Sequence, residues 1–234
     1  MAKRVYLFHE GSKDDRDLLG GKGANLCEMT SLGLPVPYGF IITTSTCREF
    51  FQSGNRLPSL LEQEYRVALD LVEKKMGARL GDPETPLLFS VRSGAPVSMP
   101  GMMNTILNLG LNDEITEGLA RKTGNPRFAY DSYRRFIQMF ADVVMHVDGG
   151  KFEHAIGKYK ADHDTTDDPE MTAEDWQAII AIYKTLVDVP EDPFKQLKLA
   201  VEAVFMSWHT PRAIVYREMS NSPDSLGTAC RGRP

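Results

Sequence analysis

The stretch from Leu87 to Gly110, LLFSVRSGAPVSMPGMMNTILNLG, constrains the fold of this chain more than any other. Its first residues are predominantly apolar up to Arg92, a pattern typical of a buried strand that delivers a charged side chain to the edge of a sheet. Glycine and proline then interrupt residues 94–101, so neither a helix nor a strand ladder can continue and main-chain NH groups are left free. A strand-like run resumes at 106–109. The loop is therefore held at both ends, and we expect an anionic ligand there.

The same residues also allow a purely structural interpretation. An arginine at the end of a strand often pairs with a surface carboxylate rather than with a phosphate. Met99, Met102 and Met103 are more typical of packing than of chemistry. A second, independent indication is therefore needed.

That indication comes from residues 18–26, LLGGKGANL, in which three glycines surround Lys22. Each glycine costs about 0.5–1 kcal/mol relative to alanine in an ordered helix, which suggests a backbone that must approach something closely. The spacing of Leu26, Met29 and Leu32 predicts a helix that starts just after the glycines. Lys22 and free NH groups would then lie at a helix amino terminus, a favourable position for phosphate. A plain helix-capping turn with an exposed lysine accounts for the segment almost equally well.

The spacing around Lys22 is neither that of a Walker A loop nor that of a dinucleotide-binding fingerprint. Elsewhere in this half, the sequence predicts strands at Val5–Phe8 and Gly39–Thr43, a short helix that Thr46 caps and that ends at Phe51, and an amphipathic helix at Pro58–Met76.

Beyond Gly110 the sequence is almost entirely helical. Three helix starts are marked by a capping residue followed by proline, at Pro126, Pro193 and Pro211, and Thr172 opens a further capping box. Apolar residues at helical spacing in this region predict core faces rather than a cofactor site. Residues 162–170 contain five acidic residues and a histidine, and we interpret them as a solvated linker.

These patterns predict an α+β fold with two lobes. Residues 1–110 and 195–234 are expected to form a sheet-bearing lobe that carries the phosphate-binding elements. Residues 111–194 are expected to form an inserted helical lobe.

Composition excludes several classes of function. The formal net charge is −5 at pH 7 and no basic run is present, which argues against nucleic acid or an anionic membrane as a partner. Three cysteines without metal-binding spacing fit a reducing compartment, and we expect no metal site. The amino terminus lacks the apolar region of a secretory signal, so a cytoplasmic location is expected, with an organelle not excluded. The histidines show no hydrolase motif.

Four segments resemble the amino-terminal nucleotide-binding domain of pyruvate, phosphate dikinase, namely residues 18–29, 90–110, 123–140 and 211–219. The resemblance runs from about Val5 to Ala229. The related pyruvate, water dikinases share the GGK and VRS motifs but typically carry a different loop after the second motif. They are therefore the less favoured relatives.

The resemblance implies the amino-terminal part of an ATP-grasp-like domain, with ATP as substrate. Lys22 and Arg92 would correspond to ligands of the ATP phosphates, and Arg92 would be the catalytic candidate. The loop from Met99 to Thr105 would cover the phosphates through main-chain NH groups near Gly101 and Met103. The family enzymes convert ATP, pyruvate and phosphate to AMP, phosphoenolpyruvate and diphosphate, require Mg²⁺ and are homo-oligomers.

Residues 230–234, CRGRP, depart from the family's pattern. By the resemblance, the third ATP-grasp subdomain with the protein ligands of Mg²⁺, the phosphohistidine domain and the pyruvate barrel would all lie outside this chain. Two expectations stay open at this point. The chain is either the ATP-binding part of a dikinase, inactive without the missing carboxyl-terminal domains, or a non-catalytic truncated fragment or binding module without turnover.

Overall fold

The computed structural model describes residues 2–165 and 167–234, and these residues fall into two compact units. The first unit comprises Met1–Gly77, Phe89–Thr105 and Lys198–Pro234. The second unit comprises Ala78–Leu88 and Ile106–Leu197. The assignment of phosphate binding to one of these units stays a prediction.

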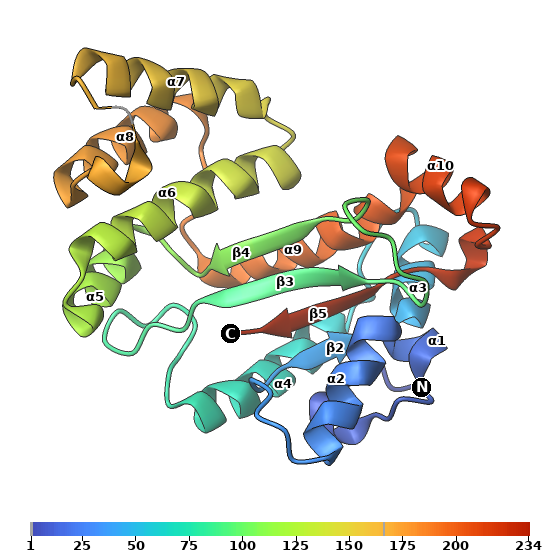
Figure 1. Ribbon diagram of the computed structural model, residues 1–234. Helices are drawn as coiled ribbons and strands as arrows, with labels where there is room; N and C mark the ends of the chain where they lie inside the picture. Colours follow the sequence, from blue (N-terminus) through green and yellow to red (C-terminus); the bar gives the residue numbers. More distant parts are fainter. Residues whose placement is uncertain (1, 166) are drawn as a thin grey trace. The chain divides into compact units, whose positions relative to one another are not determined.

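A five-stranded sheet has the strand order β1-β2-β5-β3-β4 (Figure 1). The strands are β1 (Val5–Leu7), β2 (Phe40–Ile42), β3 (Phe89–Gly94), β4 (Thr105–Leu109) and β5 (Ala229–Arg233). β5 pairs antiparallel with β2 on one side and with β3 on the other. The last residues of the chain therefore lie in the middle of the sheet, and the predicted α+β class is confirmed.

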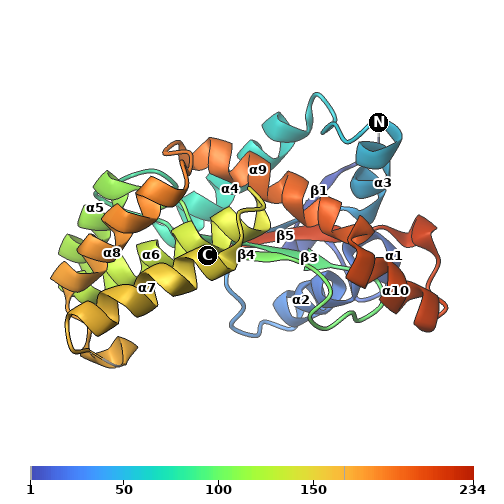
Figure 2. The same ribbon diagram turned by 90° about the horizontal axis from the view of Figure 1, so that it is seen from above.

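Helices of the first unit cover both faces of this sheet. They are α1 (Arg16–Leu19), α2 (Gly21–Ser31), α3 (Thr44–Gln52), α4 (Leu61–Met76) and α10 (Pro211–Met219), together with most of α9 (Pro193–Met206). Figure 2 shows α2 on one face and α4 on the other. The alternation of the strands explains this arrangement, because successive side chains point to opposite faces. Ile41 belongs to a buried cluster on the α2 side, whereas its neighbour Phe40 stacks on Tyr65 of α4.

Two helix starts differ from the sequence prediction. Helix α2 begins at Gly21, so Lys22 lies inside its first turn rather than before the helix. The reason is Gly20, which takes φ 73° as the N-cap residue and accepts a hydrogen bond from Ala24 N at 2.9 Å. Helix α3 is capped by Thr43 and not by Thr46, because the Thr43 side chain accepts a hydrogen bond from the Thr46 amide.

The second unit contains most of β4 and is otherwise mainly helical, with α5 (Asp113–Thr123), α6 (Pro126–Val143), α7 (Gly149–Asp162) and α8 (Ala173–Leu186). Helix α6 packs against the other three. The predicted cap at Pro126 is confirmed, since Asn125 accepts a hydrogen bond from Phe128 N at 3.0 Å. The capping box of Thr172 and Asp175 is also present at the start of α8.

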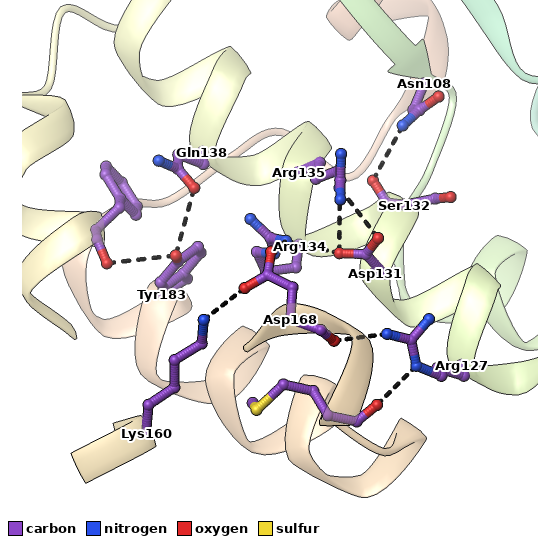
Figure 3. A network of polar contacts seen from close by, with 12 residues as sticks. Asn108, Arg127, Asp131, Ser132, Arg134, Arg135, Gln138, Lys160, Asp168 and Tyr183 are labelled. Atoms are coloured by element: carbon purple, nitrogen blue, oxygen red, sulfur yellow. Dashed lines mark hydrogen bonds and ion pairs between the residues drawn. The ribbon is translucent and has the colours of Figure 1, made fainter. Parts of the chain in front are cut away.

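The acidic segment before α8 is not a solvated linker throughout, because Asp168 is tied to two helices (Figure 3). Its carboxylate accepts a hydrogen bond from Lys160 Nζ of α7 at 2.6 Å and lies 3.4 Å from Arg134 Nη2 of α6. Its main-chain oxygen accepts from Arg127 Nη2 at 2.6 Å. The sequence prediction was wrong for this residue because charge content alone does not reveal partners on other helices.

Within the described ranges, no helix combines the length and the apolar character that crossing a membrane requires.

Candidate functional site

Arg92 lies near the end of β3, as the sequence predicts for a charged residue after an apolar strand. Its Cα partner on β5 is Arg231, so two arginines face each other directly across an antiparallel pair. Such opposed residues have side chains on the same face, about 4.5–5.5 Å apart at Cβ. Arg231 also pairs with Ile41 of β2, a residue of the buried cluster on the α2 side. Both arginines are therefore on the face of the sheet that carries α2.

Helix α2 begins beside the end of β3. A Cβ atom at Gly20 would lie 1.8 Å from the main-chain oxygen of Gly94, so only glycine fits at this crossing. Gly21 N donates to Ala95 O at 3.0 Å, and Gly23 packs against Ile41 of β2. Close approaches within the chain thus account for the glycines around Lys22, and Gly20 also forms the helix-capping turn that the structural interpretation of this segment proposed. The consequence is nevertheless that the first turn of α2 is fixed next to Arg92.

The loop that follows β3 is held through its main-chain carbonyl groups. Pro96 O accepts a hydrogen bond from Arg16 Nε at 2.9 Å, and Met102 O accepts from Arg212 Nε at 3.1 Å. Ser98 O accepts from the hydroxyl of Tyr216 at 3.2 Å. With these three carbonyl groups bound to donors elsewhere in the first unit, main-chain NH groups of the loop remain available to a ligand.

The methionines of this loop anchor it to the core. Met99 is buried in a cluster with Trp208 and Ala213, and Met102 and Met103 pack against the same cluster. These contacts confirm that the methionine side chains pack, as the sequence interpretation favoured. Any role of Met103 in binding therefore belongs to its backbone.

Several main-chain amides of the first turn of α2 and of the loop have no hydrogen-bond acceptor within the described chain. Among them are those of Lys22 and Gly23 in α2 and of Gly101 and Met103 in the loop. Free amides in the first turn of a helix favour an anion, because the helix dipole adds partial positive charge there. Gly101 adopts φ 72°, a conformation that suits glycine.

The first turn of α2, the end of β3 and the loop line one cavity of about 340 Å³ in the first unit. All five site residues predicted from the sequence line it, namely Lys22, Arg92, Gly101, Met103 and Thr105. Arg16, Asn25 and Arg231 also line it, and the sequence interpretation did not name them. No carboxylate belongs to the lining formed by the described residues, so the wall is cationic and polar.

Arg92 and Arg231 face each other at an electrostatic cost. Burial, followed by the neighbouring charges of Arg92 and Arg233, lowers the pKa of Arg231 to about 10. Burial and then Arg233 also lower the pKa of Arg92. The Nε groups of Arg92 and Arg231 are buried and have no acceptor among the described residues. Like charges in direct opposition destabilise a sheet, so an anion between them would relieve an existing cost.

Arg134 and Arg135 of the second unit are different, as Figure 3 shows. Both pair with Asp131, and Arg134 also stacks over the ring of Trp176, with its guanidinium 4.6 Å from the ring centroid. These cations are neutralised by residues of their own unit. In contrast, the described residues that line the cavity beside Arg92 and Arg231 include no carboxylate.

Part of this site could have been found from the sequence. The tail from Ala229 to Arg233 alternates small residues with Arg231 and Arg233, which is the period of a strand with both arginines on one face. Arg16, in the polar sequence DDRD, carries no comparable signal.

Comparison with known proteins gives one family for nearly the whole chain. A family model described as the pyruvate phosphate dikinase AMP/ATP-binding domain matches residues 16–71 and 55–230. Pyruvate, phosphate dikinase of Clostridium symbiosum is 52% identical over 236 residues, which cover 98% of this chain and 27% of that protein. The chloroplastic pyruvate, phosphate dikinase 1 of Oryza sativa subsp. japonica is 52% identical over 237 residues, or 97% of this chain and 25% of the relative.

The enzyme of Rhizobium meliloti (strain 1021) is 49% identical over 239 residues, or 98% of this chain and 27% of the relative. The chain thus spans about a quarter of the length of the relatives it matches. The matched segments include Lys22, Arg92 and the loop between β3 and β4. This chain therefore belongs to the family of the pyruvate phosphate dikinase AMP/ATP-binding domain.

Proposed function

We propose that this chain is the ATP-binding part of a pyruvate, phosphate dikinase and that Lys22, Arg92 and the 99–105 loop hold the ATP phosphates. One observation carries the proposal. Lys22, Arg92, Gly101, Met103 and Thr105 line a single cavity whose described wall contains no carboxylate. A phosphate chain would supply the missing negative charge.

The groups in this cavity suit phosphate for separate physical reasons. Arg92 offers a planar guanidinium that can donate two parallel hydrogen bonds to one phosphate, and Lys22 offers a mobile point charge. One ammonium about 4 Å from one phosphate charge is worth roughly 4 kcal/mol at an effective dielectric constant near 20. The free amides of Gly101 and Met103 add donors that need no reordering. The cavity volume also lies in the range of small-ligand sites, about 300–1,000 Å³.

For the complete enzyme we propose the family's reaction, in which ATP, pyruvate and phosphate yield AMP, phosphoenolpyruvate and diphosphate. Phosphoryl transfer depends mainly on positioning and on neutralising charge. Arg92 is the proposed catalytic residue, because its guanidinium is held by a strand and can stabilise charge on a transferring phosphoryl group. The acceptor of that group and the pyruvate site would come from domains beyond this chain, so we expect no turnover from the chain alone.

Magnesium, which the family implies, does not fit the side chains of this cavity. Mg²⁺ prefers oxygen ligands and is usually bound through one or two carboxylates together with phosphate oxygens. The described residues that line the cavity include no Asp or Glu, and the described ranges hold no cluster of three or more potential metal ligands. We therefore assign no protein ligand of the metal to this chain.

Titration of ATP into the chain by calorimetry tests the proposal. Lys22→Ala and Arg92→Ala should each weaken ATP binding about tenfold or more, because each removes one cation next to the phosphates. Lys122→Ala is the matched control, since Lys122 is exposed and lies in the second unit. Wild-type affinity in both site variants would exclude the proposal.

A further inference from the structure

We propose that Arg212 is a positioning residue of the proposed phosphate site and that it acts through the peptide between Met102 and Met103. Its side chain holds this peptide so that the Met103 amide points into the cavity and can donate to a phosphate oxygen. The inference rests on the proposed function and deepens it, because Arg212 belongs to α10 and does not line the cavity. All three residues lie in the first unit.

Arg212 binds the residues of the loop that do not line the cavity. Within 101–105, the residues that line it are Gly101, Met103 and Thr105. The guanidinium of Arg212 contacts the two residues between them. Its Nε donates to Met102 O at 3.1 Å, and its Nη2 donates to Asn104 Oδ1 at 2.7 Å. Arg212 therefore holds this part of the loop from the side away from the cavity.

The hydrogen bond to Met102 O also sets the direction of the next amide. A peptide group is planar and trans, so its carbonyl oxygen and its N–H point in opposite directions. Because Met102 O is bound to a side chain outside the cavity lining, the N–H of Met103 points to the opposite side. Met103 lines the cavity, and its amide has no acceptor within the described chain. Arg212 thus aims one of the donors that we assign to phosphate.

Local sequence shapes the loop before this peptide but does not set the peptide itself. Met102 N donates to Met99 O at 3.3 Å across Pro100 and Gly101, and Gly101 has φ 72°. Proline followed by a glycine with positive φ is typical of a type II turn, which these residues form by themselves. The Met102–Met103 peptide lies after this turn and before β4 begins at Thr105. Its direction therefore depends on the donor that Arg212 supplies.

Arg212 is suited to this role because the start of α10 is fixed (Figure 1). Pro211 occupies the first turn of the helix, where its ring restricts φ. Ala213 is buried in the cluster that contains Met99 and Trp208. The planar guanidinium of arginine holds its donors in fixed directions and can reach two acceptors at once. A lysine at the same position would keep the charge but offer only one mobile ammonium group.

Calorimetric titration of ATP and of adenosine into the whole chain tests the inference. Arg212→Ala should weaken ATP binding about tenfold, because a misdirected amide loses a hydrogen bond to a charged oxygen. Arg212→Lys should still weaken it about threefold or more, although the charge is kept. Adenosine affinity should stay at the wild-type value in both variants. Arg56→Ala is the matched control, since Arg56 is an exposed arginine of the same unit outside the cavity.

A measurement without nucleotide tests the same role independently of ATP. The heteronuclear NOE of a backbone amide reports its order on the ps–ns timescale. In the free chain, the NOE of the Met103 amide should fall in Arg212→Ala and stay at the wild-type value in Arg56→Ala. An unchanged NOE in Arg212→Ala would overturn the inference whether or not the chain binds ATP.

The outcomes separate this inference from the proposed function. ATP affinity that falls in Lys22→Ala and Arg92→Ala but not in Arg212→Ala would overturn the inference and leave the proposed function intact. Wild-type ATP affinity in Arg212→Lys, or an equal loss in Arg56→Ala, would assign the effect to charge alone and overturn it as well. A lowered NOE in a chain that does not bind ATP would support the hold of Arg212 on the loop and exclude the proposed function.

Discussion

Replacing Arg231 by methionine is expected to stabilise the folded chain when no anion is bound. The neighbouring strand places Arg92 directly opposite, and Arg233 lies two residues away on the same face. Methionine keeps a long unbranched side chain in the same space and removes the charge. The folded state then loses an electrostatic cost that the unfolded state does not share.

The magnitude follows from the titration of Arg231. Its pKa falls to about 10 from the much higher value of an ordinary arginine, and each tenfold change in proton affinity is worth 1.36 kcal/mol, so the charged form costs about 3 kcal/mol in the folded state. Loss of the hydrogen bond to Ser93 O offsets about 1 kcal/mol. We therefore expect a net gain of about 2 kcal/mol in the free energy of unfolding at neutral pH. Replacing buried charged residues by apolar residues of similar volume is often stabilising.

Urea unfolding measures this change. The chain has two tryptophans, and Trp208 lies in the same unit as Arg231, so its fluorescence reports on that unit. Arg56→Met is the control, because a surface substitution should change stability by no more than about 0.5 kcal/mol. A loss of 1 kcal/mol or more in Arg231→Met would refute the argument, since it would mean that the guanidinium stabilises the fold as it stands.

Two further predictions concern contacts that stabilise the first and the second unit. Gly20→Ala should destabilise the first unit by about 3 kcal/mol or more, because the new Cβ would meet Gly94 O at 1.8 Å and φ is positive. Gly157→Ala, whose Cβ meets nothing within 4 Å, should be neutral or stabilising in thermal unfolding, and equal effects would contradict the packing argument. The hydrogen bond from Lys160 holds the pKa of Asp168 below its usual range. The stabilisation by the Asp168 carboxylate is therefore fully present above the pKa that this group has in the unfolded chain. It is lost as the pH falls through the lower pKa of the folded state. Asp168→Asn should lower the free energy of unfolding by about 1 kcal/mol at neutral pH, a value reduced by solvent screening, and should have little effect in acid. An effect in urea unfolding that does not change with pH would contradict this assignment.

The central strand, the loop and the helix after the glycines were predictable because their signals are local. Apolar runs, proline and glycine define β3, the loop and α2, and the structure brings Lys22 and Arg92 to one cavity. The resemblance to a known family supplied the nucleotide, which no local pattern identifies.

Residues that depend on partners distant in sequence could not be predicted in the same way. The alternation of residues 229–233 predicts a strand, but the position of Arg231 opposite Arg92 depends on the insertion of β5 between β2 and β3, and strand order does not follow from the spacing of residues. Asp168 is held by residues of α6 and α7, so its acidic surroundings were misleading. The glycines around Lys22 predict that another group approaches the backbone closely. At Gly20 that group is Gly94 O rather than a ligand.

The most direct test of the account compares ATP with adenosine on the wild-type chain and on Lys22→Ala and Arg92→Ala. Adenosine lacks the phosphates, so its affinity should be the same in all three proteins, whereas ATP affinity should fall about tenfold or more in each variant. ATP affinities that stay at the wild-type value in both variants would contradict the assignment of these two cations to the phosphates.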